Sequence, residues 1–369
     1  MKRKILFLGL SFILVASLIS ASVLTSCNKT STTTKASTTT STTAANTPQY
    51  GGTLTVLNQY YNEECAGWDP QLNQRPWSGS IWVTPIVDWL AVGDIEKYGP
   101  RGNNAYAFKI DQNIPEQYLR GQVLTSWAVD TSASPMTITF NVRHGIMWSG
   151  NTVIGMAARE LTANDVVYTL KRGFAAPTVS GVYKWVSSVT AKDDYTVVLE
   201  ISDFNAIWPF YLMCGYHPGN IICPEWGDTQ VGGGSEDWKN TVSDGPFIIT
   251  NYTSGVGATF TKNDNYWDTT TINGTKYKVP FIKTLVYPII PDESTAVANL
   301  RTAKIDWWYW VPTTYASSLD STGVLKDSWM TGKCDSFIVN RQENQYTKNK
   351  AVRQALVKAT DFTAIRDLV

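Results

Sequence analysis

The aromatic run from Trp307 to Trp310 is the densest group of side chains in this sequence that could hold a flat or ring-shaped ligand. The chain contains 15 Trp and 18 Tyr, and such rings serve either as core or as surfaces that stack on sugars and other flat groups. We interpret residues 305–310 as a strand, so alternation places Trp307 and Tyr309 on one face and Trp308 and Trp310 on the other. One pair should be core, and the alternation leaves open which; Tyr309 is our preferred ligand contact.

Residues that carry covalent chemistry are present without a catalytic arrangement. The sequence has no G-x-S-x-G, H-E-x-x-H or P-loop motif, and Gly232–Gly234 lacks the Lys-Ser/Thr pair that would contact phosphate. The carboxylates are scattered, and two His make a His-based metal site a poor expectation. We therefore expect no enzyme, no cofactor and no metal. A secreted carbohydrate-active enzyme with paired carboxylates is the competing class, and a surface adhesin or inactive remnant is the third.

Cys27 has the most specific expected chemistry of any single residue. The basic residues Lys2–Lys4 precede an apolar run from Ile5 to Val23 and the small-residue ending Leu24-Thr25-Ser26-Cys27. This order is typical of a secretory signal, although the apolar run is also long enough for a transmembrane helix. The ending resembles a bacterial lipobox, which implies cleavage before Cys27 and a lipid on its thiol. We predict a signal peptide over 1–27 and a disordered Ser/Thr-rich tether over 28–49.

Charge and the remaining cysteines restrict the partners and the compartment. The 31 basic and 31 acidic residues cancel, so nothing favours nucleic acid, whose partners carry a basic excess. An extracytoplasmic site would permit disulfides. Cys214 and Cys223 are close enough in sequence to pair, but separate thiols are an equal alternative, and Cys65 and Cys334 leave other pairings open.

The chain carries clear signals for the elements that would position these residues. Ile138, Phe140 and Val142 alternate with polar residues as in a half-buried strand. Thr162 is placed to cap a helix, with Asp165 in its first turn. Further expected elements are a helix over 80–92, strands over 51–57, 196–201, 258–267 (ending in a turn) and 336–340, a helix after Asp292 and a helix over 349–356.

Several of these stretches resemble one protein family. The phrases LTSWAVD (124–130), TITFNVRHGIMWSG (137–150) and LTANDVVYTLKR (161–172) are similar to the signature region of the family 5 solute-binding proteins of ABC importers, the oligopeptide/dipeptide/nickel-type group. Further similar phrases lie at 258–267, 282–306 and 349–361. The chain departs from the family where a short D-G-x-P turn is replaced by residues 149–160.

The resemblance implies an α/β, periplasmic-binding-protein-like fold (type II, cluster C) with mixed sheets in two lobes. Lobe I would comprise 50–86 and 225–333, lobe II would comprise 87–224, and 334–369 would begin a third lobe. Family members run longer, so we expect a C-terminally truncated chain whose third lobe is largely missing.

The resemblance also implies a function and a ligand site. The chain would capture peptides or related small solutes outside the membrane by hinge closure and deliver them to ABC permease subunits. An oligosaccharide-binding member of the same family is the alternative. We expect a monomer anchored by lipid at the outer face of the cytoplasmic membrane or in the periplasm. The expected ligand contacts are Gln74, Trp77, His217, Asp244, Gly245, Trp308, Tyr309 and Trp310.

Overall fold

The computed structural model describes residues 47–57, 65, 67–71, 82–108, 114–176, 180–214, 219–309, 311–323, 325–326, 346, 348–361 and 363–364. Contacts divide the chain into Met1–Thr47 and Pro48–Val369, and every element below belongs to the second unit. The predicted signal peptide and nearly all of the tether lie outside the described residues. Four of the expected contacts, Gln74, Trp77, His217 and Trp310, also lie outside them, as does the expected strand over 336–340.

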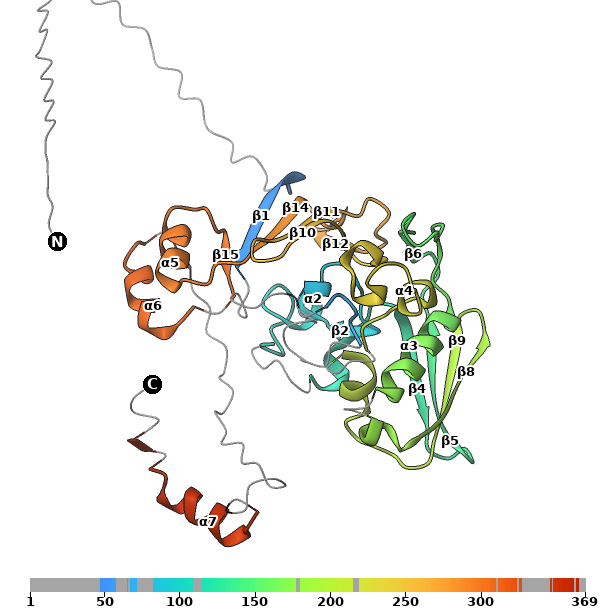
Figure 1. Cartoon of the computed structure of the whole chain (residues 1–369). Coiled ribbons are helices and arrows are strands. Elements are labelled where there is room, and N and C mark those ends of the chain that lie inside the picture. Colours follow the sequence, from blue (N-terminus) through green and yellow to red (C-terminus); the bar gives the residue numbers. More distant parts are fainter. Residues whose placement is uncertain are drawn as a thin grey trace, which may run out of the picture. The chain divides into compact units, whose positions relative to one another are not determined.

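A mixed five-stranded sheet forms around β1 (Gly51–Leu57). The other strands are β10 (Phe247–Thr253), β11 (Gly257–Lys262), β14 (Ile282–Pro288) and β15 (Trp307–Trp308), in the order β10-β11-β14-β1-β15 (Figure 1). β1 pairs in parallel with both β14 and β15, whereas β11 is antiparallel to β10 and β14. The three parallel strands therefore have their carboxyl ends at one edge of the sheet.

A second sheet is wholly antiparallel and contains the stretch that we matched to the family signature. Its strands are β4 (Leu124–Asp130), β5 (Met136–Val142), β8 (Val186–Asp193) and β9 (Thr196–Ile201), in the order β4-β5-β9-β8. Ile138, Phe140 and Val142 are buried while their neighbours along β5 are half-buried. The alternation predicted from the sequence is therefore confirmed.

Three short two-stranded sheets lie outside the two main sheets. They are β2 (Ala91–Gly93) with β3 (Leu119–Gly121), β6 (Met147–Trp148) with β7 (Arg159–Glu160), and β12 (Thr269–Ile272) with β13 (Thr275–Lys278). The insertion relative to the family joins β6 to β7. Within it, Asn151 donates two side-chain hydrogen bonds, to the carbonyl oxygens of Lys239 and Thr241, at 2.7 and 2.9 Å.

The described helices are α2 (Ile95–Tyr98), α3 (Ala163–Ala175), α4 (Pro224–Gly227), α5 (Glu293–Arg301), α6 (Thr313–Asp320) and α7 (Lys350–Ala359), with short 3₁₀ turns at 116–118, 180–183, 234–236 and 238–240 and a π turn at 210–214. Two of them, α3 and α5, begin where capping side chains were expected. At the start of α3, the Thr162 amide donates to Asp165 Oδ2 at 2.9 Å. At the start of α5, Asp292 Oδ1 accepts from the Thr295 amide at 2.7 Å. These carboxylates satisfy amides that have no partner inside the helix.

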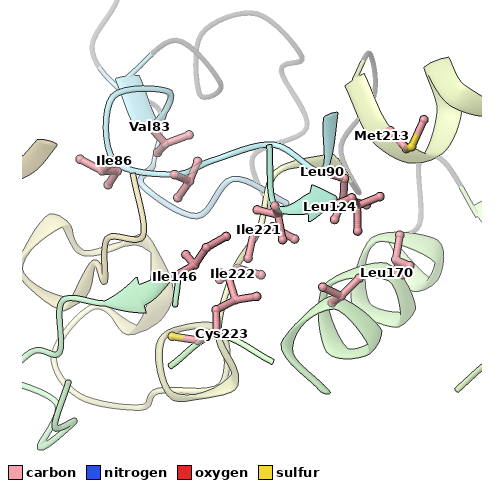
Figure 2. Close-up of a cluster of buried hydrophobic side chains, with 14 of the residues drawn as sticks. Val83, Ile86, Leu90, Leu124, Ile146, Leu170, Met213, Ile221, Ile222 and Cys223 are labelled. Carbon is pink, nitrogen blue, oxygen red and sulfur yellow. The ribbon is translucent and has the colours of Figure 1, made fainter. Parts of the chain in front are cut away.

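Most buried side chains belong to one large hydrophobic cluster that draws on both main sheets. Figure 2 shows part of it, where Leu90 lies near Leu124 and Ile221, and Ile86 lies near Val83. A smaller cluster packs Leu57 and Trp308 against α5 and α6 through Val297, Leu300 and Leu319. Two adjacent residues of β1 therefore pack in different clusters: Val56 is part of the large cluster and Leu57 is part of the small one.

The expected helix over 80–92 is wrong within its described part. Only Trp82 and Val83 are helical, and the chain then turns and enters β2. The segment is held by other parts of the fold: the Leu90 amide donates to the Gly219 carbonyl at 3.0 Å, and the Phe247 amide donates to the Pro85 carbonyl at 3.0 Å. Bonds to distant backbone therefore replace the i to i−4 bonds of a helix.

The described cysteines and helices bear on two open alternatives. Cys214 and Cys223 are free thiols, so of the two alternatives for this pair, separate thiols are the one found. Among the residues that the structure describes, none of the helices has the length and apolar character needed to cross a membrane.

Candidate functional site

The carboxyl edge of the parallel strands is where this sheet can present residues to a ligand. β1 ends at Leu57 and β15 ends at Trp308, with the Tyr309 amide donating to the Leu57 carbonyl at 3.0 Å. In open α/β sheets, ligands bind beyond the carboxyl ends of the strands. The first residue after β15 is therefore at a position where this architecture brings side chains to a ligand.

Two aromatic side chains are exposed at this edge. Trp307 is 54% exposed and Tyr309 is 41% exposed. Their ring centroids are 6.0 Å apart at an interplanar angle of 74°, an edge-to-face arrangement that aromatic pairs prefer. The two rings therefore offer apolar and π surface in two directions. Alternation alone did not show which aromatic pair is core. Among the described residues, Trp307 and Tyr309 are the exposed pair.

Trp308 has the opposite environment. It is 5% exposed and packs in the small cluster with Leu57 and the helices α5 and α6. The sequence-based expectation made it a ligand contact, but in this structure its indole is core. The reason is the register, which pairs Trp308 with Leu57, so both side chains lie on the face that the two helices cover.

The turn into β15 is fixed by a second set of bonds to β1. The Asp306 amide donates to the Thr55 carbonyl at 2.9 Å, and Asp306 Oδ2 accepts from the Thr55 amide at 2.7 Å. A carboxylate that accepts from a backbone amide forms one of the stronger protein hydrogen bonds. Residue 306 therefore sets the position of Trp307 and Tyr309 on the rigid sheet.

Asp244 and Gly245 lie in the interior rather than at this edge. Asp244 is 1% exposed, and its Oδ1 accepts from the Asp88 amide at 3.1 Å. A Cβ on Gly245 would lie 2.7 Å from the Ile86 carbonyl carbon and 2.8 Å from the Val87 nitrogen. Gly245 is thus required for a close approach of two backbone segments. Asp244 and Gly245 were expected to contact ligand, but in this structure both have packing roles.

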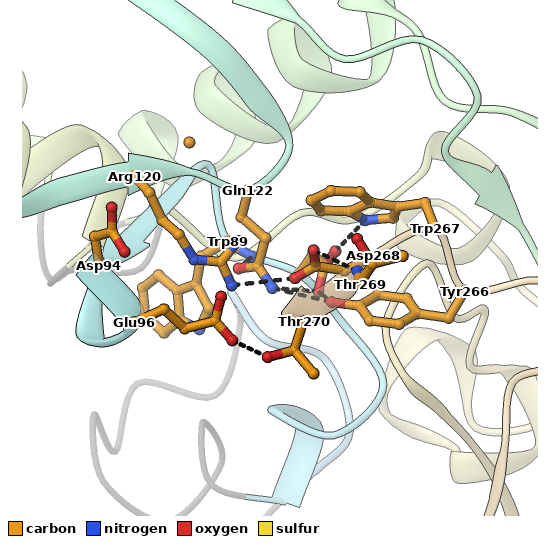
Figure 3. A network of polar contacts seen from close by, with 12 residues as sticks. Trp89, Asp94, Glu96, Arg120, Gln122, Tyr266, Trp267, Asp268, Thr269 and Thr270 are labelled. Carbon is orange, nitrogen blue, oxygen red and sulfur yellow. Dashed lines mark hydrogen bonds and ion pairs between the residues drawn. The ribbon is translucent and has the colours of Figure 1, made fainter. Parts of the chain in front are cut away.

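Asp88 is the centre of a buried polar cluster that sequence reasoning missed. Its Oδ1 accepts from Gln122 Nε2 at 2.6 Å and from the Tyr266 hydroxyl at 3.0 Å, and its Oδ2 accepts from Trp267 Nε1 at 2.8 Å. Figure 3 shows Gln122, Tyr266 and Trp267 directed at the same place. The sequence signal was an acidic residue within an otherwise apolar stretch, Val83 to Ala91, and it passed unnoticed because that stretch was assigned to a helix.

The charges around this cluster are largely paired with other groups. Arg120 forms an ion pair with Asp268 at 3.1 Å. The guanidinium carbon of Arg143 lies 4.1 Å from the centroid of a Trp267 ring, and Arg143 Nε donates to the Gln122 carbonyl at 2.8 Å. Burial raises the pKa of Asp88 to about 7, against the hydrogen bonds from Trp267 and Tyr266 that lower it.

A buried ion pair joins α3 to the segment 67–71. Arg172 donates to both Asp69 oxygens, at 2.8 and 2.6 Å, and the Asp69 side chain is fully buried. Arg172 also donates to Gln71 Oε1 at 3.2 Å. This two-point contact fixes the start of the loop in which Gln74 and Trp77 were expected to meet ligand.

The described side chains at the strand edge are suited to binding rather than to covalent chemistry. Aromatic faces and backbone groups can hold a ligand, and the exposed side chains at this edge are the rings of Trp307 and Tyr309. Within the described ranges there is no group of three or more His, Cys, Asp and Glu that could hold a metal ion.

The sequence matches one family over most of its length. Residues 119–369 match the family described as "Bacterial extracellular solute-binding proteins, family 5 Middle". This is more than half of the chain, so the chain belongs to that family. The family predicted from the signature phrases is therefore confirmed.

Curated relatives are binding proteins of the same family type. The chain is 27% identical over 222 residues to the oligopeptide-binding protein AppA of Bacillus subtilis, covering 56% of this chain and 37% of the relative. It is 29% identical over 188 residues to the dipeptide-binding protein of Escherichia coli, covering 47% and 33%. The matches thus span little more than a third of these relatives. Both are binding proteins rather than enzymes, in agreement with our expectation.

Solved structures confirm the fold class. AppA of B. subtilis in complex with a nonapeptide superposes with a TM-score of 0.58 at 19% identity, over 85% of this chain and 55% of that one. The ABC transporter-associated periplasmic binding protein DppA of Helicobacter pylori, in complex with the peptide STSA, gives 0.56 at 20% identity, over 74% and 49%. The α/β periplasmic-binding-protein-like fold with mixed sheets is therefore the fold of this chain.

Proposed function

We propose that this chain is the extracytoplasmic solute-binding component of an ABC importer and that it captures peptides without altering them. The observation that carries the proposal is the exposed pair Trp307 and Tyr309 at the carboxyl edge of the parallel strands. The relatives named for oligopeptide and dipeptide binding support peptides as the solute class. Main-chain groups of the ligand would bind at the sheet edge, and the two rings would contact its apolar side chains.

Capture would involve closure of lobes around the solute. Closure is driven only by contacts that are stronger in the closed state than in the open one. We place Trp307 and Tyr309 among those contacts, because desolvating an exposed aromatic ring is favourable by roughly 25 cal/mol per Å². Gln74, Trp77, His217 and Trp310 remain predicted contacts of the same site.

An oligosaccharide is the second candidate ligand, and a specific observation favours it. Exposed aromatic faces on a rigid strand are suited to stacking on sugar rings.

The intrinsic Trp fluorescence of the chain should be titrated with a peptide library and with an oligosaccharide library. The bound material should then be recovered and its mass determined by mass spectrometry. Peptides recovered with unchanged mass support the proposal. Recovered oligosaccharides shift it to the second ligand class, and cleaved products of either kind contradict it.

We further propose that Cys27 carries a lipid that anchors a monomeric chain at the outer face of the membrane, where the permease subunits would receive the solute. Cells expressing the wild type or Cys27→Ser should be labelled with a fatty-acid probe. We expect the label on the wild type and its loss from the variant. Cys65→Ser is the matched control and should keep the label. Equal labelling of wild type and Cys27→Ser would contradict the anchor.

A further inference from the structure

Two buried acidic residues that the proposed function does not use are joined by a hydrogen bond. Asp88 is fully buried and Asp244 is 1% exposed. Asp244 Oδ1 accepts from the Asp88 amide at 3.1 Å, so the two residues are in direct contact through that bond. Asp88 precedes β2, and Asp244 precedes β10 of the five-stranded sheet. The contact therefore joins segments that are 156 residues apart in the sequence.

Among the described residues, no ion pair joins either carboxyl group to a cationic side chain. The nearby Arg120 is paired with Asp268, and Arg143 donates to backbone carbonyls while it stacks on Trp267. On the Asp244 side, Asp165 is the other acidic group within electrostatic range, and Arg159 binds it at 2.6 Å. Two ionised carboxylates in this interior would have little to offset their desolvation and mutual repulsion.

The hydrogen bonds distinguish the two groups. Asp88 accepts from three side chains, Gln122, Tyr266 and Trp267, which suits a carboxylate. Asp244 Oδ2, in contrast, is buried without a hydrogen-bond partner in the described structure. A neutral carboxyl group tolerates such a position much better than an ionised one. The proton is therefore better placed on Asp244 than on Asp88.

We infer that Asp244 is protonated and that Asp88 and Asp244 form a pH-sensitive joint between the five-stranded and the four-stranded sheet. The joint reaches the four-stranded sheet through Gln122, which precedes β4, and the five-stranded sheet through Tyr266 and Trp267, which follow β11. Loss of the proton from Asp244 places two like charges inside the joint, which weakens the contact between the segments that precede β2 and β10.

The direction of the pH effect follows from the two carboxyl groups. Burial raises the pKa of Asp88 to about 7 from an ordinary value of 3.8, and burial together with the nearby Asp88 raises the pKa of Asp244 well above that value. Between pH 4 and pH 7 the folded chain therefore holds protons that the unfolded chain has lost. Stability contributed by the pair is present below about pH 4 and falls as the pH rises.

The first measurement is the infrared spectrum of the chain at pH 6, where a protonated carboxyl group gives a carbonyl band that ionised groups lack. We expect such a band in the wild type and a weaker band in Asp244→Asn, because the variant lacks one of the two carboxyl groups of the pair whose pKa is raised. Asp203→Asn, at an exposed position, is the matched control and should keep the band. A wild-type spectrum with no band from a buried protonated carboxyl group would overturn the inference.

The second measurement locates the effect in the joint. Hydrogen exchange of the Asp88 and Gly245 amides, corrected for intrinsic rates, should be followed from pH 5 to pH 8. We expect the opening equilibrium of these amides to increase about tenfold or more in the wild type across this range, with a much smaller change in Asp244→Asn. The Phe140 amide in β5 serves as the internal reference. An equal pH response in wild type and Asp244→Asn would overturn the joint.

Discussion

At the scale of single residues, the chain uses its acidic side chains for structure. Asp306 fixes β15 to β1, Asp165 and Asp292 satisfy helix amides, and Asp88 collects three side-chain donors. The helix-capping roles could be predicted, because a cap depends on neighbours within three or four residues. The role of Asp88 could not, since its donors lie 34, 178 and 179 residues away.

Replacing Asp88 by Asn should destabilise the chain, in contrast to Asp244→Asn. An amide has a single acceptor oxygen, so the indole of Trp267, or else Gln122 together with Tyr266, would be left without its acceptor inside the core. We expect a loss of about 1–3 kcal/mol in the free energy of unfolding at pH 7, measured by urea denaturation. A loss below the error of the measurement would show that the three hydrogen bonds contribute no net stability.

Asp244→Asn removes the buried group that repels Asp88. It should leave the free energy of unfolding at pH 7 unchanged or raised, because an amide costs less to bury than an ionised carboxyl group. The two substitutions should therefore differ in their effect on the free energy of unfolding. That difference identifies Asp88 as the hydrogen-bond acceptor and Asp244 as the protonated group. Destabilisation of similar size in both variants would contradict that distinction.

At the scale of elements, prediction succeeded where local pattern and tertiary context agree. The alternation of β5 and the starts of the helices α3 and α5 were expected from the sequence and are observed. The segment 82–92 was assigned wrongly because its apolar residues could not indicate how many distant segments bond to it. Of the strand expected over 305–310, the described residues 305–309 form strand at Trp307 and Trp308, which pair with Val56 and Leu57 of β1.

The ion pair of Arg172 with Asp69 allows a test of how α3 is tied to the segment around residue 69. Arg172→Ala would leave the fully buried Asp69 carboxylate without its two-point partner. Breaking a buried pair in this way costs about 3–5 kcal/mol, which urea denaturation should detect. Lys171→Ala, at the exposed neighbouring position, is the matched control and should lie within about 0.5 kcal/mol of the wild type. Equal stability of the two variants would contradict a structural role for the pair.

At the scale of the whole molecule, the family and fold could be predicted from phrases that are specific to the family, and both are confirmed. The ligand site could be predicted only in part. Tyr309 lies at the expected strand edge, but Trp307, which was not among the expected contacts, is the more exposed ring, and Trp308 is core. The difference arises because pairing register decides which face the helices α5 and α6 cover, and a sequence pattern of period two does not contain the register.

The account depends most on the claim that the aromatic pair at the strand edge binds the solute. The decisive measurement is calorimetric titration of the recovered solute into wild type, Trp307→Ala, Tyr309→Ala and Phe204→Ala, the last an exposed aromatic outside the site. We predict affinity about tenfold weaker or more for Trp307→Ala and Tyr309→Ala, and wild-type affinity for Phe204→Ala. Wild-type affinity in both Trp307→Ala and Tyr309→Ala, with all proteins folded by circular dichroism, would contradict the claim.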